Sequence, residues 1–295
     1  MGNKEFTIAL FGNCHQSKKS IYTGLVIRHL TDRNVNVVIE EDFYNHIHAT
    51  MGITCNSEQI INSKDFSADI AISMGGDGTF LKTAQMVGAK ELPILGINIG
   101  HLGFMAEVTP EEISRMIDNI VDNNFSVEER SVLEVISSQG NIGIYPYALN
   151  EVAVLKQDIS SMIQIKAEVD GTYLTTYMAD GLIVSTPTGS TGYSLSVGGP
   201  ILSPNSPVVV ISPVAPHSLN VRPIVLLDNV KVKLKVEGRS KGYLLSVDGR
   251  SERREEDEEL TIRKATYKIR IIKNDRKSYF DSLREKLMWG TDLRN

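Results

Sequence analysis

The hydrophobic pattern changes its period part-way along the chain, and this change constrains the fold more than any other feature. Up to about Asn124, short apolar runs alternate with segments of helical spacing. From about Ser131, apolar and polar residues alternate singly, as in Val230–Val236, where every second residue is a lysine. Strands alternating with helices indicate a parallel sheet covered on both faces, and a period of two indicates half-buried strands. The sequence therefore predicts an α/β domain followed by a β-rich domain.

The predicted first domain, residues 1–125, is a Rossmann-like parallel sheet with covering helices. The helix after Thr109 has the strongest signals, because Thr109 and Glu112 form a capping box and Pro110 takes the first helical position. The other expected helices are Ser20–Asp32 and Thr79–Val87, and the expected strands are Phe6–Phe11, Val35–Glu40, Ala68–Ser73 and Pro93–Ile99.

The predicted second domain, residues 126–275, is all-β, and we expect two packed sheets. Asp170-Gly171 is a two-residue hairpin signal between apolar segments. The expected strands are Met162–Val169, Tyr173–Thr176, Tyr243–Val247, Leu260–Arg263 and Thr266–Ile272, and the charged run Glu252–Glu259 is interpreted as a solvated turn. The tail, residues 276–295, holds a short predicted helix, Tyr279–Trp289, and is expected to pack back on the first domain.

Composition excludes several classes of protein. A net charge of −5 over 295 residues argues against a nucleic-acid groove or an anionic membrane surface. The two cysteines, Cys14 and Cys55, are too few for a disulfide framework and are expected to be reduced thiols. No apolar stretch approaches the ~20 residues of a membrane span, and the N-terminus resembles a strand and not a signal peptide. We therefore expect a cytoplasmic protein.

The first glycine-rich stretch, Ser73–Leu81, lies where a predicted strand ends and a helix begins. Ligands bind at that edge of open α/β sheets, and glycines beside a helix N-terminus let phosphate approach the backbone. Asp77 is unusual among phosphates, because it would repel them unless it binds a metal or accepts a proton. The alternative is a tight Gly-Asp-Gly turn without function. The stretch is not a P-loop, because no Gly-Lys-Ser/Thr follows.

The second glycine-rich stretch, Asp180–Pro200, combines a short strand, Leu182–Val184, with many hydroxyl groups. Tyr193 could stack on a base or pack beneath the loop, and Pro187 introduces a bend. Hydroxyl-rich loops are often ordinary turns, but the length of this loop favours ligand binding. Its hydroxyl residues are Ser185, Thr186, Thr188, Ser190, Thr191, Ser194 and Ser196.

These motifs, in this order and spacing, resemble those of the NAD kinase family. The resemblance rests on Gly75-Gly-Asp-Gly-Thr79, Asn150-Glu151, Asp180–Tyr193, Ser212–Asn220 and Ser246-Val-Asp-Gly249. It spans most of the chain, and the long motif that begins at Asp180 is the most specific. The Gly-Gly-Asp-Gly element alone is weaker, because diacylglycerol-kinase and phosphofructokinase relatives carry something similar.

The resemblance implies that the chain phosphorylates the 2′-hydroxyl of the adenosine ribose of NAD to give NADP. The resemblance also implies that Asp77 is the catalytic base. The chemistry fits, because the hydroxyl is a poor nucleophile at neutral pH and general-base assistance contributes about 10²–10⁴-fold. Gly78 would give close backbone approach, and Lys82 a positive charge near the phosphates. The implied fold agrees with the pattern, with an N-terminal α/β domain, a β-rich domain and a returning tail.

The resemblance also implies a set of binding residues. Asn150 and Glu151 would bind the ribose hydroxyls or the donor side, Asp180 the nicotinamide end, and the segment after it the dinucleotide. The full set is Gly78, Lys82, Asn150, Glu151, Asp180, Thr188, Thr191, Gly192, Tyr193, Ser194, Leu195, Ser196, Ala215 and Arg250. His217 is interpreted as structural. Two residues depart from the family pattern: Met178 replaces a common arginine, and Gly192 a common alanine.

The expected ligands are NAD, a phosphoryl donor such as ATP, and a divalent cation, Mg²⁺ or Mn²⁺, brought by the donor without a dedicated protein metal site. A homodimer or homotetramer is also expected, as in the family. Two rivals are a lipid or sugar kinase and a non-catalytic dinucleotide sensor. The lipid kinase is disfavoured because no basic amphipathic segment points to a membrane, and the sensor because Asp77 and its flanking glycines are present. The sequence leaves open the donor (ATP, another triphosphate or polyphosphate) and the use of NADH.

Overall fold

The computed structural model describes residues 6–13, 20–54, 59–100, 103–157, 161–237, 242–256 and 258–290. The chain divides into two compact units, which we call unit 1 (residues 1–129 and 269–295) and unit 2 (residues 130–268). Cys14 and Cys55, and with them the thiol prediction, lie outside the described residues.

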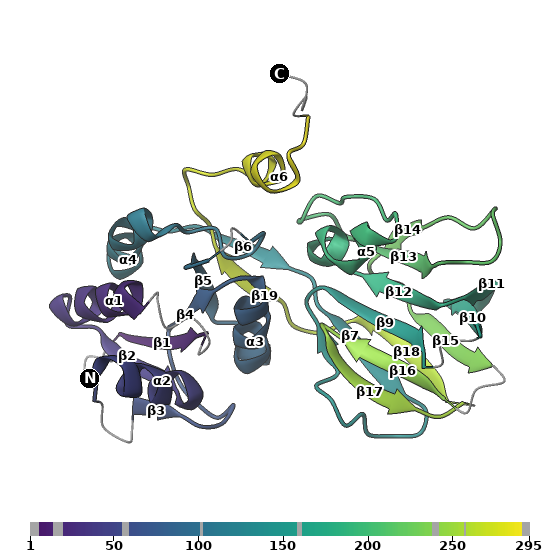
Figure 1. The fold of residues 1–295 in the computed structure, drawn as a ribbon, viewed down its shortest axis with the longest axis horizontal. Helices are drawn as coiled ribbons and strands as arrows, with labels where there is room; N and C mark the ends of the chain where they lie inside the picture. The colour runs from purple at the N-terminus through teal and green to yellow at the C-terminus, as the bar shows by residue number, and fades with distance from the viewer. Residues whose placement is uncertain are drawn as a thin grey trace. The chain divides into compact units, whose positions relative to one another are not determined.

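Unit 1 contains a seven-stranded sheet with the order β3-β2-β1-β4-β5-β19-β6 (Figure 1). Neighbouring strands from β3 to β19 run parallel. The strands are β1 (Thr7–Gly12), β2 (Asn36–Glu40), β3 (Ile60–Ile61), β4 (Ile70–Gly75), β5 (Pro93–Asn98), β6 (Val127–Arg130) and β19 (Ile269–Ile272). The chain leaves β1 toward β2 on one side and returns to β4 on the other, so the carboxyl ends of β1 and β4 form the switch point where such sheets bind ligands.

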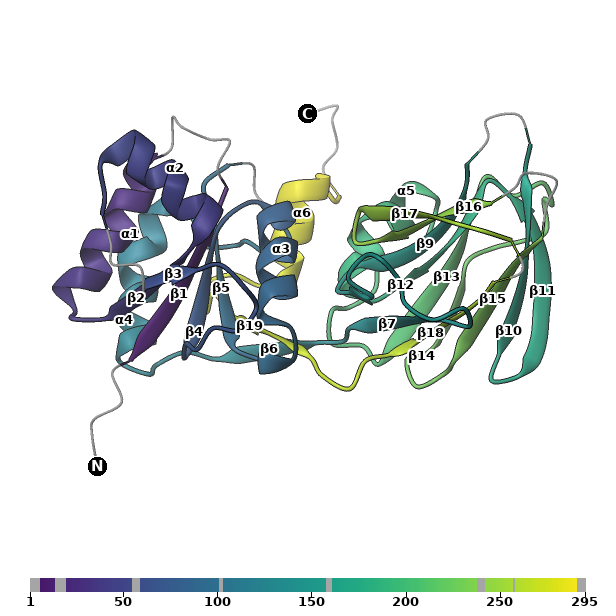
Figure 2. The same ribbon diagram turned by 90° about the horizontal axis from the view of Figure 1, so that it is seen from below.

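Helices cover this sheet on both faces. Apolar side chains of α1 (Ser20–Asp32), α2 (Glu41–Met51) and α4 (Ile113–Val121) share one core with alternate strand residues such as Ile8 and Ile72. Helix α3 (Asp77–Val87) packs on the opposite face through Phe80, which lies over Gly96 of β5. Figure 2 shows α1, α2 and α4 on one side of these strands and α3 on the other. The predicted parallel sheet covered on both faces is confirmed.

The capping box predicted at Thr109 is present. Thr109 N–H donates to Glu112 Oε2 at 3.2 Å, and Pro110 opens a short 3₁₀ turn that continues into α4. Helix α6 (Tyr279–Leu287), preceded by another capping box at Ser278, belongs to unit 1. Ser282 Oγ of α6 donates to Glu107 Oε1 at 2.9 Å, so the tail packs back on the α/β unit as expected.

The strand predicted at Thr266–Ile272 forms from Ile269 onward, but its assignment to the β-rich half is wrong. It is β19, and it pairs in parallel with β5 of unit 1, Arg270 opposite Pro93. Ile269, Ile271 and Ile272 are all buried. The physical reason is that β19 extends the parallel sheet beyond β5, a long-range pairing that local alternation does not report.

Unit 2 consists of two antiparallel six-stranded sheets whose side chains share one core. The first sheet has the order β11-β10-β15-β18-β7-β8 and the second β14-β13-β12-β9-β16-β17. The strands are β7 (Leu133–Ser137), β8 (Tyr147–Ala148), β9 (Glu151–Lys156), β10 (Ile163–Val169), β11 (Thr172–Ala179), β12 (Gly181–Ser185), β13 (Val208–Val214), β14 (Ile224–Leu227), β15 (Val232–Glu237), β16 (Tyr243–Val247), β17 (Arg250–Arg254) and β18 (Glu259–Lys264). The prediction of an all-β domain of two packed sheets is confirmed.

Local turn chemistry in unit 2 behaves as predicted in one place and not in another. Asp170 and Gly171 have φ of 49° and 78° and join β10 to β11, as a hairpin of this type requires. The solvated turn predicted at Glu252–Glu259 is wrong in part, because β17 reaches Arg254 and Glu258 is only 1% exposed. Glu258 can be buried because Arg254 and Tyr243 both donate hydrogen bonds to it.

None of the described helices is long and apolar enough to span a membrane.

Candidate active site

The Asp77 carboxylate is held by three backbone N–H groups. Oδ2 accepts from Phe104 at 2.7 Å, and Oδ1 accepts from Met105 at 2.9 Å and Ala106 at 3.3 Å. A carboxylate offers about four acceptor positions, so one position, on Oδ2, is left for a further donor. Asp77 is the first residue of α3, and one residue, Gly76, separates it from the carboxyl end of β4. The predicted base therefore lies at the ligand-binding edge of the sheet in a defined orientation.

Glycines make this arrangement possible. A Cβ at Gly103 would lie 1.9 Å from Asp77 Oδ1, and a Cβ at Gly96 would lie 2.5 Å from Met105 O. The segment after Gly103 therefore lies directly on β5 and reaches the aspartate. At Gly76 and Gly78, by contrast, a Cβ would meet no atom of the described residues within 4 Å. Bare backbone thus faces open space at the N-terminus of α3, which is the arrangement that binds anions.

Lys82, predicted to bring a positive charge to the phosphates, is engaged elsewhere. Its Nζ donates to Glu40 Oε1 at 2.9 Å and to Asp42 Oδ2 at 3.4 Å, which ties α3 to the start of α2. Glu40 is 7% exposed and also caps α2 through Phe43 N–H. The lysine therefore compensates a buried carboxylate, and its role toward phosphate stays a prediction.

Another cation lies on α6. Lys286 Nζ lies 3.8 Å from the centroid of the Phe104 ring, and the nitrogen is buried without a hydrogen-bond partner among the described residues. Burial lowers the pKa of Lys286 to about 8, although the carboxylates of Asp77 and Glu107 oppose this shift. Phe104 is the residue whose N–H binds Asp77, so α6, the loop at 103–106 and the start of α3 form one connected cluster in unit 1.

In unit 2, Asp248 positions the Asn150-Glu151 pair. Its carboxylate accepts the backbone N–H groups of Leu149 at 2.7 Å, Asn150 at 2.9 Å and Glu151 at 3.1 Å. Asp248 N–H donates in return to Glu151 O at 3.1 Å. Two aspartates of the sequence motifs, Asp77 and Asp248, thus use the same device of one carboxylate that binds three consecutive N–H groups.

The hydroxyl-rich loop packs against that pair. Thr186 Oγ1 donates to Leu149 O at 2.6 Å, and a Cβ at Gly189 would lie 2.2 Å from Asn150 O. Most of the hydroxyls counted in the sequence are bonded within the fold: Ser185, Thr186, Ser190, Thr191 and Ser194. Ser194 is fully buried against Ser212 Oγ, so its predicted ligand contact has no available hydroxyl to support it.

Three buried polar atoms around this loop have no hydrogen-bond partner in the part of the chain that the structure describes: Asn150 Oδ1, Glu151 Oε2 and Thr188 Oγ1. A Cβ at Gly192 would lie 3.3 Å from Glu151 Oε2, which places that glycine over the carboxyl group. Burial, with the nearby Asp248 charge, raises the pKa of Glu151 to about 7. Unpaired buried polar atoms are costly, and a polar ligand bound here could pair with these three, which belong to predicted binding residues.

The remaining predicted binding residues differ in their exposure and in their contacts within the fold. Asp180 Oδ1 pairs with Lys156 Nζ at 2.7 Å, close in sequence to Met178, which is 40% exposed. Ala215 is exposed in a left-handed conformation with φ of 44°, a strain common at functional sites. Arg250 donates to Val247 O and Tyr147 O and so has a structural use. Tyr193 is 38% exposed, and Thr191, Leu195 and Ser196 are at least partly exposed beside it.

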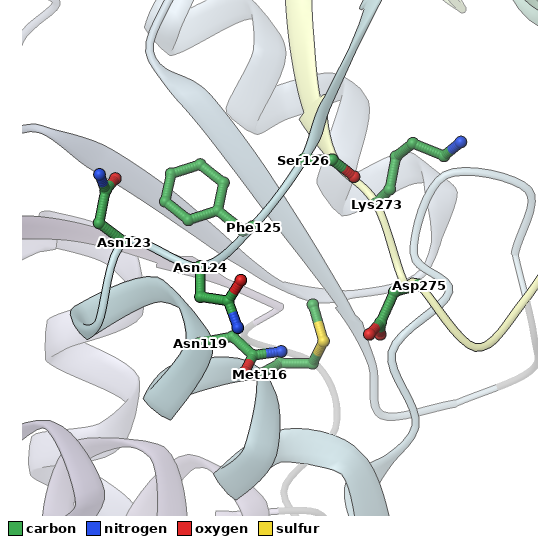
Figure 3. A pocket seen from close by; sticks show the side chains of 8 residues that line it. All are labelled: Met116, Asn119, Asn123, Asn124, Phe125, Ser126, Lys273 and Asp275. Atoms are coloured by element: carbon green, nitrogen blue, oxygen red, sulfur yellow. The ribbon is translucent and has the colours of Figure 1, made fainter.

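A polar pocket of about 320 Å³ also lies in unit 1, but it contains none of the predicted site residues. Figure 3 shows its lining, which comes from the end of α4, the segment that leads into β6 and the residues after β19. Its side chains are Met116, Asn119, Asn123, Asn124, Phe125, Ser126, Lys273 and Asp275.

Comparison with known proteins identifies the family. Residues 8–125 match the family model described as the ATP-NAD kinase N-terminal domain, and residues 149–274 match the ATP-NAD kinase C-terminal domain. The chain belongs to the NAD kinase family. An NAD kinase of Bacteroides fragilis is 48% identical over 97% of this chain and 99% of its own length, and one of Christiangramia forsetii is 41% identical over 98% and 99%.

Solved structures of NAD kinase family members have the same fold. Yeast NADH kinase complexed with NADH superposes with a TM-score of 0.88 at 24% identity, over 99% of this chain and 90% of that one. An NAD kinase from Archaeoglobus fulgidus in complex with ATP gives a TM-score of 0.71 at 27% identity, over 96% and 98%.

Sequence reasoning missed three residues that the structure connects to the site. Gly103 and Lys286 lie outside the family motifs that we compared, and no local pattern marks them. Asp248 was noted as part of Ser246-Val-Asp-Gly249 but received no role. Its sequence signal is the Asp-Gly pair, which is common in turns, and Asp248 has a φ of 47°. No local pattern shows that its carboxylate accepts the N–H groups of residues 149–151, which are distant in sequence.

Proposed function

We propose that this chain is an NAD kinase that transfers the γ-phosphoryl group of ATP to the 2′-hydroxyl of the adenosine ribose of NAD, with Asp77 as general base. The observation with the most weight is family membership over both halves of the chain, with an NAD kinase that is 48% identical over 97% of its length. ATP as the donor is supported by the Archaeoglobus fulgidus relative, which was solved in complex with ATP.

The geometry of Asp77 supports the role of base. Its open acceptor position on Oδ2 is available to a substrate hydroxyl, while three N–H groups prevent the carboxylate from rotating. When the hydroxyl oxygen attacks the γ-phosphorus, its proton passes to Asp77 and the bond from phosphorus to the bridging oxygen breaks to release ADP. The proton transfer contributes about 10²–10⁴-fold, and the remaining acceleration comes from alignment and charge neutralisation.

The N-terminus of α3 supports the binding of donor phosphates. Its backbone at Gly76 and Gly78 faces open space, and Gly76 makes no side-chain cap. In this proposal a divalent cation, Mg²⁺ or Mn²⁺, is carried by the donor, since Mg²⁺ is commonly bound through substrate phosphates. The described residues contain no group of three or more His, Cys, Asp or Glu side chains placed to hold a metal.

The unpaired polar atoms of Asn150, Glu151 and Thr188 support dinucleotide binding in unit 2. Ribose hydroxyls and the carboxamide of nicotinamide both donate and accept hydrogen bonds, so they can satisfy all three. A homo-oligomer and a cytoplasmic location stay predictions.

The test is NADP formation by the purified protein from NAD, ATP and Mg²⁺, with NADH and polyphosphate as alternative substrates. Asp77→Asn is expected to lower turnover at least about a hundredfold while NAD still binds. Asp69→Asn is the matched control, because Asp69 Oδ2 likewise accepts a backbone N–H, that of Thr7 at 2.9 Å. Wild-type protein that binds NAD but makes no NADP with ATP or polyphosphate would overturn the proposal in favour of a dinucleotide sensor.

A further inference from the structure

Lys286 is the one described lysine of unit 1 whose buried ammonium group has no oxygen or nitrogen partner. Its Nζ lies over the Phe104 ring at 3.8 Å, and the aromatic face attracts the cation but supplies no hydrogen bond. An ammonium group has three N–H donors, and leaving them buried and unmet is costly. The contacts within unit 1 therefore leave Lys286 in need of an acceptor.

The surroundings of Lys286 indicate where that acceptor belongs. The charged groups that act on it are Asp77 at the start of α3, Glu107 after the loop, Lys277 before α6 and Glu285 on α6. Glu107 is bonded to Ser282, and Glu285 is paired with Lys277 at 2.5 Å. Asp77 accepts from Phe104, Met105 and Ala106, and its open position on Oδ2 is not bonded to Lys286. Each neighbouring carboxylate thus has other partners, and none of them is bonded to Lys286.

Two further observations favour an anion at this place. The bare backbone of Gly76 and Gly78 opens the N-terminus of α3, to which Asp77 belongs, so the same end of the unit offers a second anion-binding group. Lys82, the cation expected from sequence, is bonded to Glu40 and Asp42 instead. A transferring phosphoryl group that meets only N–H donors and Asp77 would lack a positive side chain, and Lys286 can supply one.

We propose that Lys286 binds a phosphate oxygen of the phosphoryl donor next to Asp77, so that the C-terminal helix α6 completes the donor site. This inference rests on the proposed kinase function and adds a residue to it. The Phe104 ring holds the side chain in place before the donor arrives. The three N–H donors of the ammonium then gain the oxygen acceptors that they lack, and its charge offsets part of the repulsion between the donor and Asp77.

The matched control is Lys90, which also lies on unit 1 and places its Nζ 5.0 Å from an aromatic centroid, that of Phe66. Lys90→Met removes a lysine–aromatic contact without touching the cluster. Lys286→Met keeps the length and apolar character of the side chain, and Lys286→Arg keeps the charge. If Lys286 has a purely structural role, Lys286→Met should lower the melting temperature, and any change in affinity should be the same for ATP as for NAD.

The experiment measures ATP and tripolyphosphate binding by calorimetry, the KM for ATP and for NAD, and the melting temperature. Lys286→Met is expected to weaken ATP and tripolyphosphate binding at least tenfold and to change the KM for NAD less than twofold. Lys286→Arg should recover most of the ATP affinity, and Lys90→Met should match wild type.

Unchanged ATP binding in Lys286→Met, or equal losses for ATP and NAD, overturns the inference while the kinase assignment stands on wild-type NADP formation. A lower melting temperature with unchanged ATP affinity also overturns it and leaves Lys286 as a packing residue. Wild-type protein that binds neither ATP nor tripolyphosphate and makes no NADP overturns the inference and the proposed function together.

Discussion

Gly103 and Asp77 are in such close contact that no side chain can be added at position 103: a Cβ there would lie 1.9 Å from Asp77 Oδ1. The glycine lets the following three residues present their N–H groups to the carboxylate. The orientation of the proposed base therefore depends on a residue 26 positions away that touches no ligand in the proposal.

Gly103→Ala is expected to lower kcat at least about tenfold, because the methyl group displaces the carboxylate from its N–H donors and misplaced catalytic groups lose rate steeply. Steady-state kinetics and thermal melting check this. Gly78→Ala serves as the stability control, since a Cβ at Gly78 meets nothing within 4 Å among the residues that the structure describes. A Gly103→Ala protein with wild-type kcat would show that the Asp77 orientation does not matter for the reaction.

Gly76→Ala is expected to leave the melting temperature unchanged within about 2 °C and to raise the KM for the donor about tenfold. The new methyl group meets no atom of the described residues within 4 Å, and φ of −97° suits alanine, so the melting temperature should not change. A phosphate group at the N-terminus of α3 would, however, lose close approach to the backbone. An unchanged donor KM would place the phosphates elsewhere.

Much of the fold could be predicted because its signals are local. The capping box at Thr109 depends on residues three apart, and the Asp170-Gly171 hairpin on two adjacent residues that adopt positive φ. The placement of β19 could not be predicted in this way. Its pairing with β5 joins Arg270 to Pro93 across most of the chain, and an isoleucine-rich strand suits either unit.

The same distinction between local and long-range signals applies to the residues of the candidate site. Asp77, Asn150 and Glu151 are visible in the sequence because they belong to compact motifs. The sequence does not show that Lys82 is bonded to Glu40, or that Lys286 lies over Phe104, since both contacts bring together segments distant in sequence. Counting hydroxyls also overestimates ligand contacts, because a buried hydroxyl such as Ser194 needs a partner within the fold and finds it in Ser212.

Asp248→Asn is expected to raise the KM for NAD about tenfold or more and to lower stability by about 1–3 kcal/mol, the usual cost of leaving a buried donor unpaired. The amide oxygen cannot accept all three N–H groups of residues 149–151, and its NH₂ group would face one of them. Kinetics and chemical denaturation measure both effects. The matched control is Asp170→Asn, which alters a carboxylate that accepts the N–H of Lys231 in a hairpin. Equal effects in both variants would contradict a specific role for Asp248.

Glu151→Gln is expected to stabilise the protein at pH 8 by on the order of 2–3 kcal/mol and to have less effect at pH 5. The folded-state pKa of Glu151 is raised to about 7, so the carboxyl group contributes stability below its unfolded value near 4.5 and loses it as pH rises through about 7. A neutral amide removes the charge that burial and Asp248 disfavour. Thermal melting between pH 5 and 8 tests this, and a constant difference across that range would show that Glu151 does not titrate there.

The pH dependence of donor use gives a separate test of Lys286. Its pKa is lowered to about 8, so the ammonium group is charged below that pH and becomes neutral above it. If the charged form binds the donor, kcat/KM for ATP should fall above pH 8, since this ratio reports groups of the free enzyme.

Two variants test this assignment. In Lys286→Arg the guanidinium stays charged throughout this pH range, so the alkaline fall in kcat/KM should disappear. In Lys286→Met, kcat/KM for ATP should be low at every pH and show no alkaline fall. The charged groups that face Lys286 are Asp77, Glu107, Lys277 and Glu285. Lys277 is the other lysine among them, so Lys277→Met is the control and should keep the wild-type profile. An alkaline fall that persists in Lys286→Met would assign the titration to another group and contradict the role of Lys286.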